Sequence, residues 1–109
     1  MPAPVAPESL LGEWVHRHEE DAGERMVFVR SGSRLPPSRG RRRLELRARG
    51  ILAATAPGRT DAPEALRGSW SLDAAGRLHL VYEAPERGEE EFRVETLAGD
   101  RLVLARVRS

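Results

Sequence analysis

The chain has 109 residues, with 18 arginines against 17 acidic residues and neither lysine nor cysteine. This length fits one domain, and the net charge of +1 provides no global field for binding nucleic acid or an anionic membrane. The lack of cysteine excludes disulfides, thiolate catalysis and cysteine-based zinc sites, and it fits a reducing compartment.

The N-terminal residues 1–8 are rich in proline and predict a disordered tail, followed by one domain over 9–109. Residues 7–11 fit a single 3₁₀ turn before the first strand. The start of the chain has no basic segment followed by an apolar one, so neither a secretory signal nor a membrane span is expected. A cytoplasmic location is therefore the expectation.

The first predicted strand, about 10–17, contains a tryptophan and two histidines at alternate positions. Because side chains in a strand alternate between its faces, Trp14, His16 and His18 share one face. The tryptophan is expected to point into a core, since it buries a large apolar surface. Glu20 continues this inner row if the strand stays extended.

The paired imidazoles have several interpretations. The strand could instead end near Val15 and leave 16–21 as a solvated turn. If His16 and His18 do face inward, they are placed to hydrogen-bond an acidic ligand or to exchange protons near neutral pH. A metal would need a third ligand, for which Glu20 is the nearest candidate. We predict neither a metal nor a cofactor.

Seven further strands are predicted from alternating apolar residues and from the turn residues between them. No segment has a helical period long enough for a stable helix. Larger apolar side chains select the inward rows, among them Met26, Phe28, Leu44, Leu46, Trp70, Leu80, Tyr82 and Phe92, whereas His79 faces out. The predicted strands cover 24–30, 41–48, 51–56, 66–72, 77–83, 89–96 and 101–107.

A basic run at Arg39 and 41–43 has two interpretations. It could be a solvated run that pairs with the acidic residues at 19–21 and 89–91. Alternatively, Arg39 or Arg42 reaches over the mouth of the fold to bind a carboxylate or phosphate. Nucleic acid is not an expected partner, because the few aromatic residues lie on core-facing rows.

Two loops are candidate parts of a binding site. The longest predicted loop, 31–40, contains Pro36-Pro37, which prevents a central strand there, and it is a candidate lid. In the second loop, Asp61 either caps its own turn or orients an arginine or histidine at the mouth.

Eight short strands joined by glycine-containing turns predict an all-β, eight-stranded, up-and-down antiparallel barrel without a long helix, because closure removes the sheet edges. The Leu-x-Gly-x-Trp pattern at 10–14, the second Gly-x-Trp at 68–70, and the runs 14–21, 36–41 and 60–61 resemble small bacterial lipocalin-like proteins of the calycin superfamily. The resemblance covers nearly the whole chain from Leu10 onward. It implies a barrel that binds a small, often hydrophobic, molecule, although a minority of such proteins are enzymes.

The leading hypothesis is an intracellular small-molecule binding protein, monomeric or homodimeric, with an apolar cavity floor and a polar rim. One rival is a cofactor-independent isomerase or cyclase in which His16, His18 and Glu20 act as acid and base. The other is an interaction module with a filled barrel. The predicted ligand-binding residues are Trp14, His16, His18, Glu20, Phe28, Arg39, Arg42, Asp61, Trp70 and Tyr82.

Overall fold

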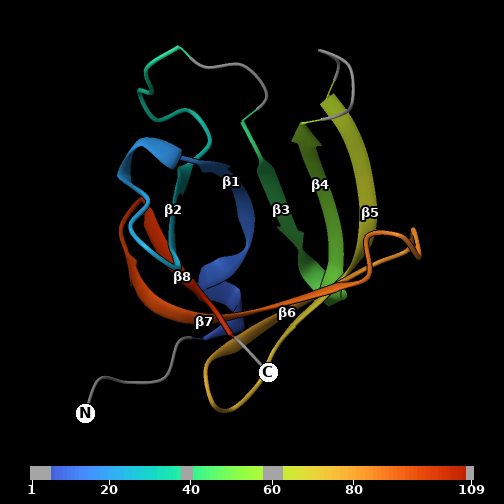
Figure 1. Cartoon of the computed structure of the whole chain (residues 1–109). Coiled ribbons are helices and arrows are strands. Elements are labelled where there is room, and N and C mark those ends of the chain that lie inside the picture. The colour runs from blue at the N-terminus through green and yellow to red at the C-terminus, as the bar shows by residue number, and fades with distance from the viewer. Residues whose placement is uncertain (1–5, 38–40, 58–62, 108–109) are drawn as a thin grey trace.

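The computed structural model describes residues 6–37, 41–57 and 63–107 as one closed barrel (Figure 1). The described residues contain no α-helix, as the sequence predicted, and three 3₁₀ turns, of which the sequence predicted only the first. The turns are η1 (Pro7–Leu10), η2 (His18–Glu20) and η3 (Ala48–Gly50). The strands are β1 (Gly12–His16), β2 (Arg25–Arg30), β3 (Arg43–Arg47), β4 (Ile51–Pro57), β5 (Pro63–Leu72), β6 (Arg77–Tyr82), β7 (Glu89–Ala98) and β8 (Arg101–Arg106).

All eight predicted strands are present, and every neighbouring pair is antiparallel. The order around the barrel is β1-β2-β8-β7-β6-β5-β4-β3, with β3 closing onto β1. The predicted closed antiparallel barrel is therefore confirmed. It departs from a strictly up-and-down order at one connection, the one between β2 and β3.

The exception arises because β1 lies between β2 and β3. Val15 is paired with Val29 on one side and with Arg43 on the other. The link from β2 to β3 must therefore cross β1 instead of forming a hairpin. The link contains Pro36-Pro37, which has no backbone N–H to offer a ladder, so this part of the chain stays outside the sheet.

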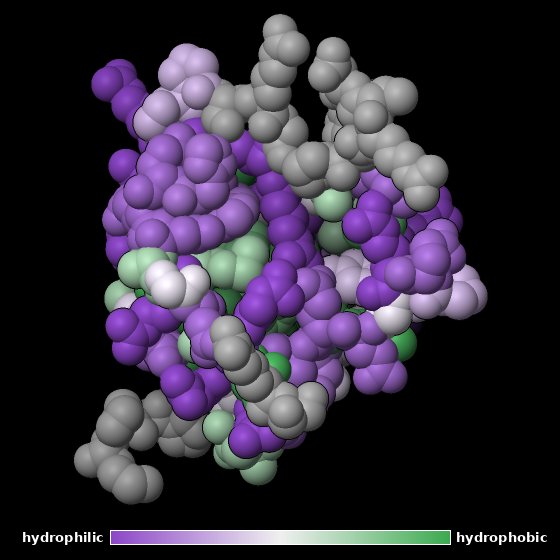
Figure 2. All heavy atoms as spheres, viewed as in Figure 1, coloured by the Kyte–Doolittle hydropathy of each residue, from purple (hydrophilic) through white to green (hydrophobic). Residues whose placement is uncertain are grey.

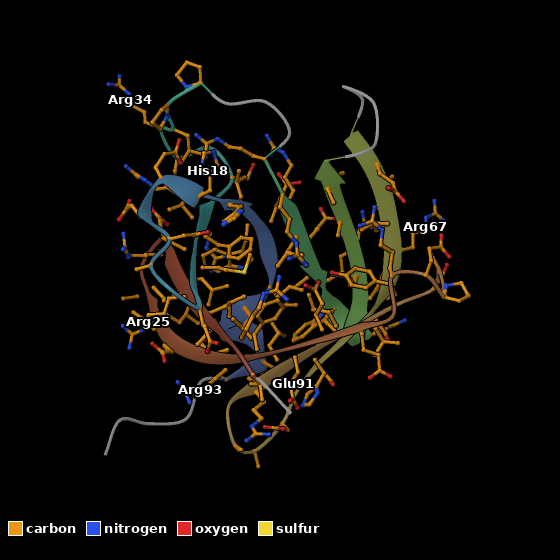
Figure 3. The ribbon with its side chains drawn as sticks, in the orientation of Figure 1. His18, Arg25, Arg34, Arg67, Glu91 and Arg93 are labelled. Carbon is orange, nitrogen blue, oxygen red and sulfur yellow. The ribbon has the colours of Figure 1, made fainter. Side chains whose placement is uncertain are left out.

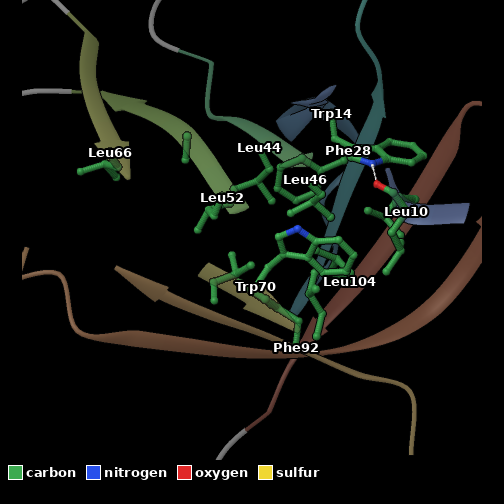
Figure 4. Packing of buried hydrophobic residues seen from close by; sticks show 14 of the residues in the cluster. Leu10, Trp14, Phe28, Leu44, Leu46, Leu52, Leu66, Trp70, Phe92 and Leu104 are labelled. Carbon is green, nitrogen blue, oxygen red and sulfur yellow. Dashed lines mark hydrogen bonds between the residues drawn. The ribbon is translucent and has the colours of Figure 1, made fainter. Parts of the chain in front are cut away.

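The barrel interior is filled by 15 buried side chains (Figure 4). Alternate residues of each strand contribute to this core, so the predicted inward rows are confirmed at Phe28, Leu44, Leu80 and Phe92, which are fully buried. Most of these side chains are fully buried and belong to one packed cluster. The interior is a core and does not form a deep cavity.

One part of the barrel is buried on both faces. Val15, Val27, Val29 and Ala105 have the outward parity, yet they are 2–6% exposed and lie apart from the interior cluster. η2 contacts β2 directly. A strand covered on both sides is apolar at consecutive positions, which explains why the sequence of β2 shows no clean alternation.

One end of the barrel is closed by η1 and an arginine. The indole Nε1 of Trp14 donates to the Leu10 carbonyl at 2.9 Å, and the Arg30 guanidinium lies 4.1 Å from the centre of the Trp14 ring. Arg30 also donates to the Leu11 carbonyl at 2.7 Å. The predicted 3₁₀ turn is thus confirmed, and Pro7 and Glu8 of the predicted tail belong to it. No helix in the described ranges is both long enough and apolar enough to span a bilayer.

Candidate functional site

The barrel end opposite η1 carries a polar cluster. Here β1 ends at His16 and β6 at Tyr82, while β3 begins at Arg43 and β7 at Glu89. Inward positions at this end surround a hollow of about 270 Å³, which we call the rim cavity. Its lining residues are Arg42, Ala56, Leu66, Tyr82, Arg87, Glu90 and Arg106.

Three side chains from three strand ends meet in the rim cavity. Arg42 Nη2 donates to the Tyr82 hydroxyl at 2.7 Å, and Arg42 Nη1 donates to Glu90 Oε2 at 3.2 Å. Nη2 also donates to Glu90 Oε1, which accepts a second hydrogen bond from the Tyr82 hydroxyl at 2.5 Å. The side chains of Arg42 and Glu90 are 15% and 17% exposed. The arginine therefore binds a carboxylate through two nitrogens in a half-dry setting, where such bonds are strong.

The cluster is held in one ionisation state around neutral pH. Burial acts to raise the pKa of Glu90, but the bonds from Arg42 outweigh it and leave that pKa below its ordinary value. Burial acts to lower the pKa of Arg42, and the bonds to Glu90 more than offset this. Burial raises the pKa of Tyr82 to about 12. None of these three groups is poised to exchange a proton at neutral pH.

Two further arginines border the rim cavity. Arg106 lies across from Phe92 in the next strand, and its Nη1 is 3.5 Å from Glu90 Oε2. Its side chain is 54% exposed. Arg87 forms an ion pair with Glu64. Three arginines and one glutamate line the cavity, so its positive charge is only partly neutralised from within.

His16 lies at the same end of the barrel but does not line the rim cavity. Its ring stacks on Phe28 with the ring centres 5.0 Å apart, and its Nε2 is 2.8 Å from Asp21 Oδ2. Asp21 Oδ1 also accepts from the Val27 N–H at 3.0 Å. These contacts fix the orientation of the ring, which supports a structural role at the strand end.

The predicted inner row is confirmed at His16, which stays in β1 on the same face as Trp14 and stacks on the buried Phe28, but it is wrong at His18 and Glu20. The chain turns into η2 immediately after β1, through hydrogen bonds from Glu20 N to Arg17 O and from Asp21 N to His18 O, each 3.1 Å. A 3₁₀ turn does not keep the two-residue period of a strand. His18 is the first residue of η2, and its side chain is 48% exposed (Figure 3), whereas Glu20 pairs with Arg17 and Arg101.

The other predicted ligand-binding residues divide into core residues and residues outside the described ranges. Trp14 and Phe28 are fully buried in the interior. Trp70 is 8% exposed, and its Nε1 donates to the Arg47 carbonyl at 2.8 Å. Arg39 and Asp61 lie outside the described residues. Of the predicted residues that the structure describes, only Arg42 and Tyr82 line the rim cavity. No group of three metal-ligating side chains occurs in the described residues.

Sequence reasoning missed Glu90 and Arg106. Glu90 is the middle of three consecutive glutamates and was interpreted as part of a solvated run. Its parity with Phe92, two residues later, is the signal that places it on the inner face. Arg106 likewise continues the inner row of Leu102 and Leu104.

Arg41 is a third missed residue, and its side chain ties the crossing link to β1. Its side chain is only 7% exposed, and its Nη1 donates to the His16 carbonyl at 2.9 Å and to Glu19 at 2.8 Å. Nη2 donates to the Pro36 carbonyl at 2.6 Å. The basic run pairs with the acidic runs here and at Arg42–Glu90, as predicted, but the two arginine side chains are largely buried and are not solvated as that interpretation expected.

The Arg41–Glu19 pair predicts a dependence of stability on pH. The hydrogen bonds from Arg41 hold the pKa of Glu19 at about 2, below its ordinary value of 4.5. A carboxyl with a lowered folded-state pKa stabilises the fold above its unfolded pKa and loses that contribution as pH falls through the folded value. We therefore expect the melting temperature of Glu19→Gln to approach that of the wild type between pH 4.5 and pH 2.

Thermal unfolding at successive pH values checks this expectation. Glu86→Gln is the matched control, because Glu86 is exposed and pairs with no described residue. A difference between wild type and Glu19→Gln that stays constant from pH 6 to about pH 2 contradicts the role of the pair.

Two other hollows lie outside the barrel interior. A groove of about 510 Å³ runs over the outer face of β3, β4 and β5, and Arg67 on its wall points away from the barrel (Figure 3). Its floor includes Gly68, where an added Cβ would lie 2.0 Å from the Val81 carbonyl oxygen. An apolar hollow of about 330 Å³ lies between η1 and η3 beside Trp70. In Figure 2 hydrophilic residues dominate the visible face, with hydrophobic ones exposed between them.

Comparisons with known proteins add no assignment. A scan against protein-family models, a search of curated proteins and a search of solved structures each return no significant match. The resemblance to lipocalin-like proteins therefore stays a prediction.

Proposed function

We propose that the chain is a small-molecule binding protein whose ligand is a small anion that enters the rim cavity. The observation that carries this proposal is the meeting of Arg42, Arg87 and Arg106 around a hollow that contains one carboxylate. Arginine presents paired N–H donors whose spacing matches a carboxylate or phosphate. An anion is thus the ligand that this lining favours.

The size and floor of the cavity define the ligand further. Ala56 and Leu66 supply an apolar portion of the wall, and the volume is about 270 Å³. This lies just below the usual range of about 300–1,000 Å³ for ligand pockets. A small organic acid with a short apolar body fits this lining better than a long hydrophobic molecule, for which the filled interior leaves no space.

Binding is better supported than catalysis. The pKa of Tyr82 is raised to about 12 and that of Glu90 is lowered, so neither group matches proton transfer near neutral pH. His16 does not line the cavity, and His18 and Glu20 belong to η2. The isomerase or cyclase hypothesis required His16, His18 and Glu20 to line one pocket, and this arrangement therefore does not support it.

An interaction module is the second candidate, and the outer groove favours it. Arg43, Arg47 and Arg67 line the groove together with Glu13, Glu45 and Glu83, so its charges balance. A two-fold interface is self-complementary, so a surface that carries both charges offers each arginine a glutamate of the second copy to pair with. The occupant in this reading is a second copy of the chain, and sedimentation velocity would detect the dimer.

The lack of cysteine supports the proposed cytoplasmic location, and the barrel architecture supports the proposed lipocalin-like family. Both stay proposals.

Nuclear magnetic resonance titration with benzoate, benzamide and benzylamine tests the main proposal, because the three probes share a ring and differ in charge. We expect benzoate alone to shift the amide signals of Arg42, Tyr82, Glu90 and Arg106. Arg67→Gln, which removes an exposed arginine on the outer groove, is expected to leave these shifts unchanged. Equal responses to all three probes, or none to benzoate, would contradict an anion site.

A further inference from the structure

The Glu90 carboxylate occupies the two nitrogens of Arg42 that an incoming carboxylate would use. Both carboxylate oxygens accept from the Arg42 fork, at 3.2 Å for Nη1 to Oε2 and closer for Nη2 to Oε1. Tyr82 completes the arrangement by donating to the same Oε1 at 2.5 Å. The protein thus binds its own carboxylate in the geometry expected for an anionic ligand.

We propose that Glu90 is an internal competitor that a ligand monocarboxylate displaces from Arg42. This inference rests on the proposed anion-binding function and names the ligand class for that site. In the bound state the ligand carboxylate accepts from Arg42 and Tyr82, and its apolar body lies toward Ala56 and Leu66. The exchange replaces one carboxylate by another, so the charge that surrounds Arg42 is conserved.

Arg106 is placed to receive the displaced Glu90. Its Nη1 is already 3.5 Å from Glu90 Oε2, which is outside close hydrogen-bonding distance but within reach of a change in side-chain rotamer. Within the described residues Arg106 forms no other ion pair. Its exposed guanidinium, which lies 5.5 Å from the Phe92 ring centre, therefore has donors available for the carboxylate.

Because Glu90 competes for Arg42, the protein should bind a carboxylate more weakly than it would if Arg42 were unoccupied. Affinity is reduced by the cost of removing Glu90 from Arg42. Removing the charge of Glu90 should accordingly tighten carboxylate binding, whereas a purely structural Glu90 would give the opposite result. The same competition explains a preference for anions, because only an anion can replace the ion pair that Arg42 loses when Glu90 leaves.

Benzoate titration of Glu90→Gln tests the inference. The glutamine keeps the volume of the side chain but loses its charge, and a charge-assisted hydrogen bond of about 1.5–3 kcal/mol corresponds to a gain in affinity of about tenfold or more. Glu91→Gln is the matched control, since Glu91 lies on the outer face beside Arg77 and His79. It should bind benzoate as the wild type does.

Glu90→Asp provides a second variant in which the charge remains but the side chain is one methylene shorter. We expect an intermediate gain, because the shorter carboxylate holds Arg42 less well. If wild type binds benzoate and neither variant binds it more tightly, Glu90 is not a competitor, although the anion site stands. If neither wild type nor any variant binds benzoate, the inference and the proposed function both fail.

Discussion

Replacing Trp14 by alanine is expected to lower the free energy of unfolding by about 3–5 kcal/mol, the range for large aromatic residues removed from a core. Trp14 is fully buried, and it links η1 to the barrel through its hydrogen bond to Leu10. Its ring also supports the Arg30 guanidinium that closes this end. Because a domain of this size is stable by only about 5–15 kcal/mol, the variant should be close to unfolding. Urea denaturation followed by circular dichroism measures the change.

Ile51→Ala is the matched control for this experiment. Ile51 is 49% exposed, and its truncation should change stability by less than about 0.5 kcal/mol. A loss below about 1 kcal/mol for Trp14→Ala would mean that the interior repacks around the missing ring, in conflict with a core fixed by that tryptophan.

The strands could be predicted because the local signals agree. Leu44 and Leu46 in β3, and Leu102 and Leu104 in β8, alternate with charged or smaller residues and are all buried. A core-facing row of this kind sets both the strand and its inward face, and the turns between strands end each run.

The strand order could not be predicted in full, because the pairing of β1 with β3 is not a local event. Residues 31–42 separate β2 from β3, and nothing in that stretch indicates that β3 pairs with β1 instead of β2. Val27 and Val29, which lie on the outward face of β2, are also buried by contacts that are not local. Whether the outer face of a strand is covered depends on where the rest of the chain lies. The alternation of residues within that strand carries no information about this.

The sequence predicted those site residues that continue the alternation of a strand to the end of the barrel. Arg42 continues the inner row of Leu44, and Tyr82 that of Leu80, so both lie in the rim cavity. His18 was misplaced because the same reasoning was carried past the end of β1 into η2. Glu90 was overlooked because charged runs are usually solvated, although its parity indicated the inner face.

Replacing Arg42 by leucine is expected to cost about 2–4 kcal/mol of stability, somewhat less than the 3–5 kcal/mol for a fully buried pair, because both partners retain some exposure. The loss arises because Glu90 and Tyr82 would keep their buried polar atoms without the guanidinium that they contact. Urea denaturation at neutral pH measures it. Arg47→Leu, which breaks the exposed pair with Glu45, should cost less than about 1 kcal/mol.

The double variant Arg42→Leu/Glu90→Leu separates the ion pair from general packing. Replacing both partners by apolar residues removes the uncompensated charge, so most of the stability lost in Arg42→Leu should return. A double variant that is less stable than Arg42→Leu would instead mean that Glu90 stabilises the barrel independently of Arg42. We expect the double variant to regain stability and both variants to lose benzoate binding. This result would mean that Arg42 binds the ligand and that Glu90 occupies Arg42 when no ligand is present.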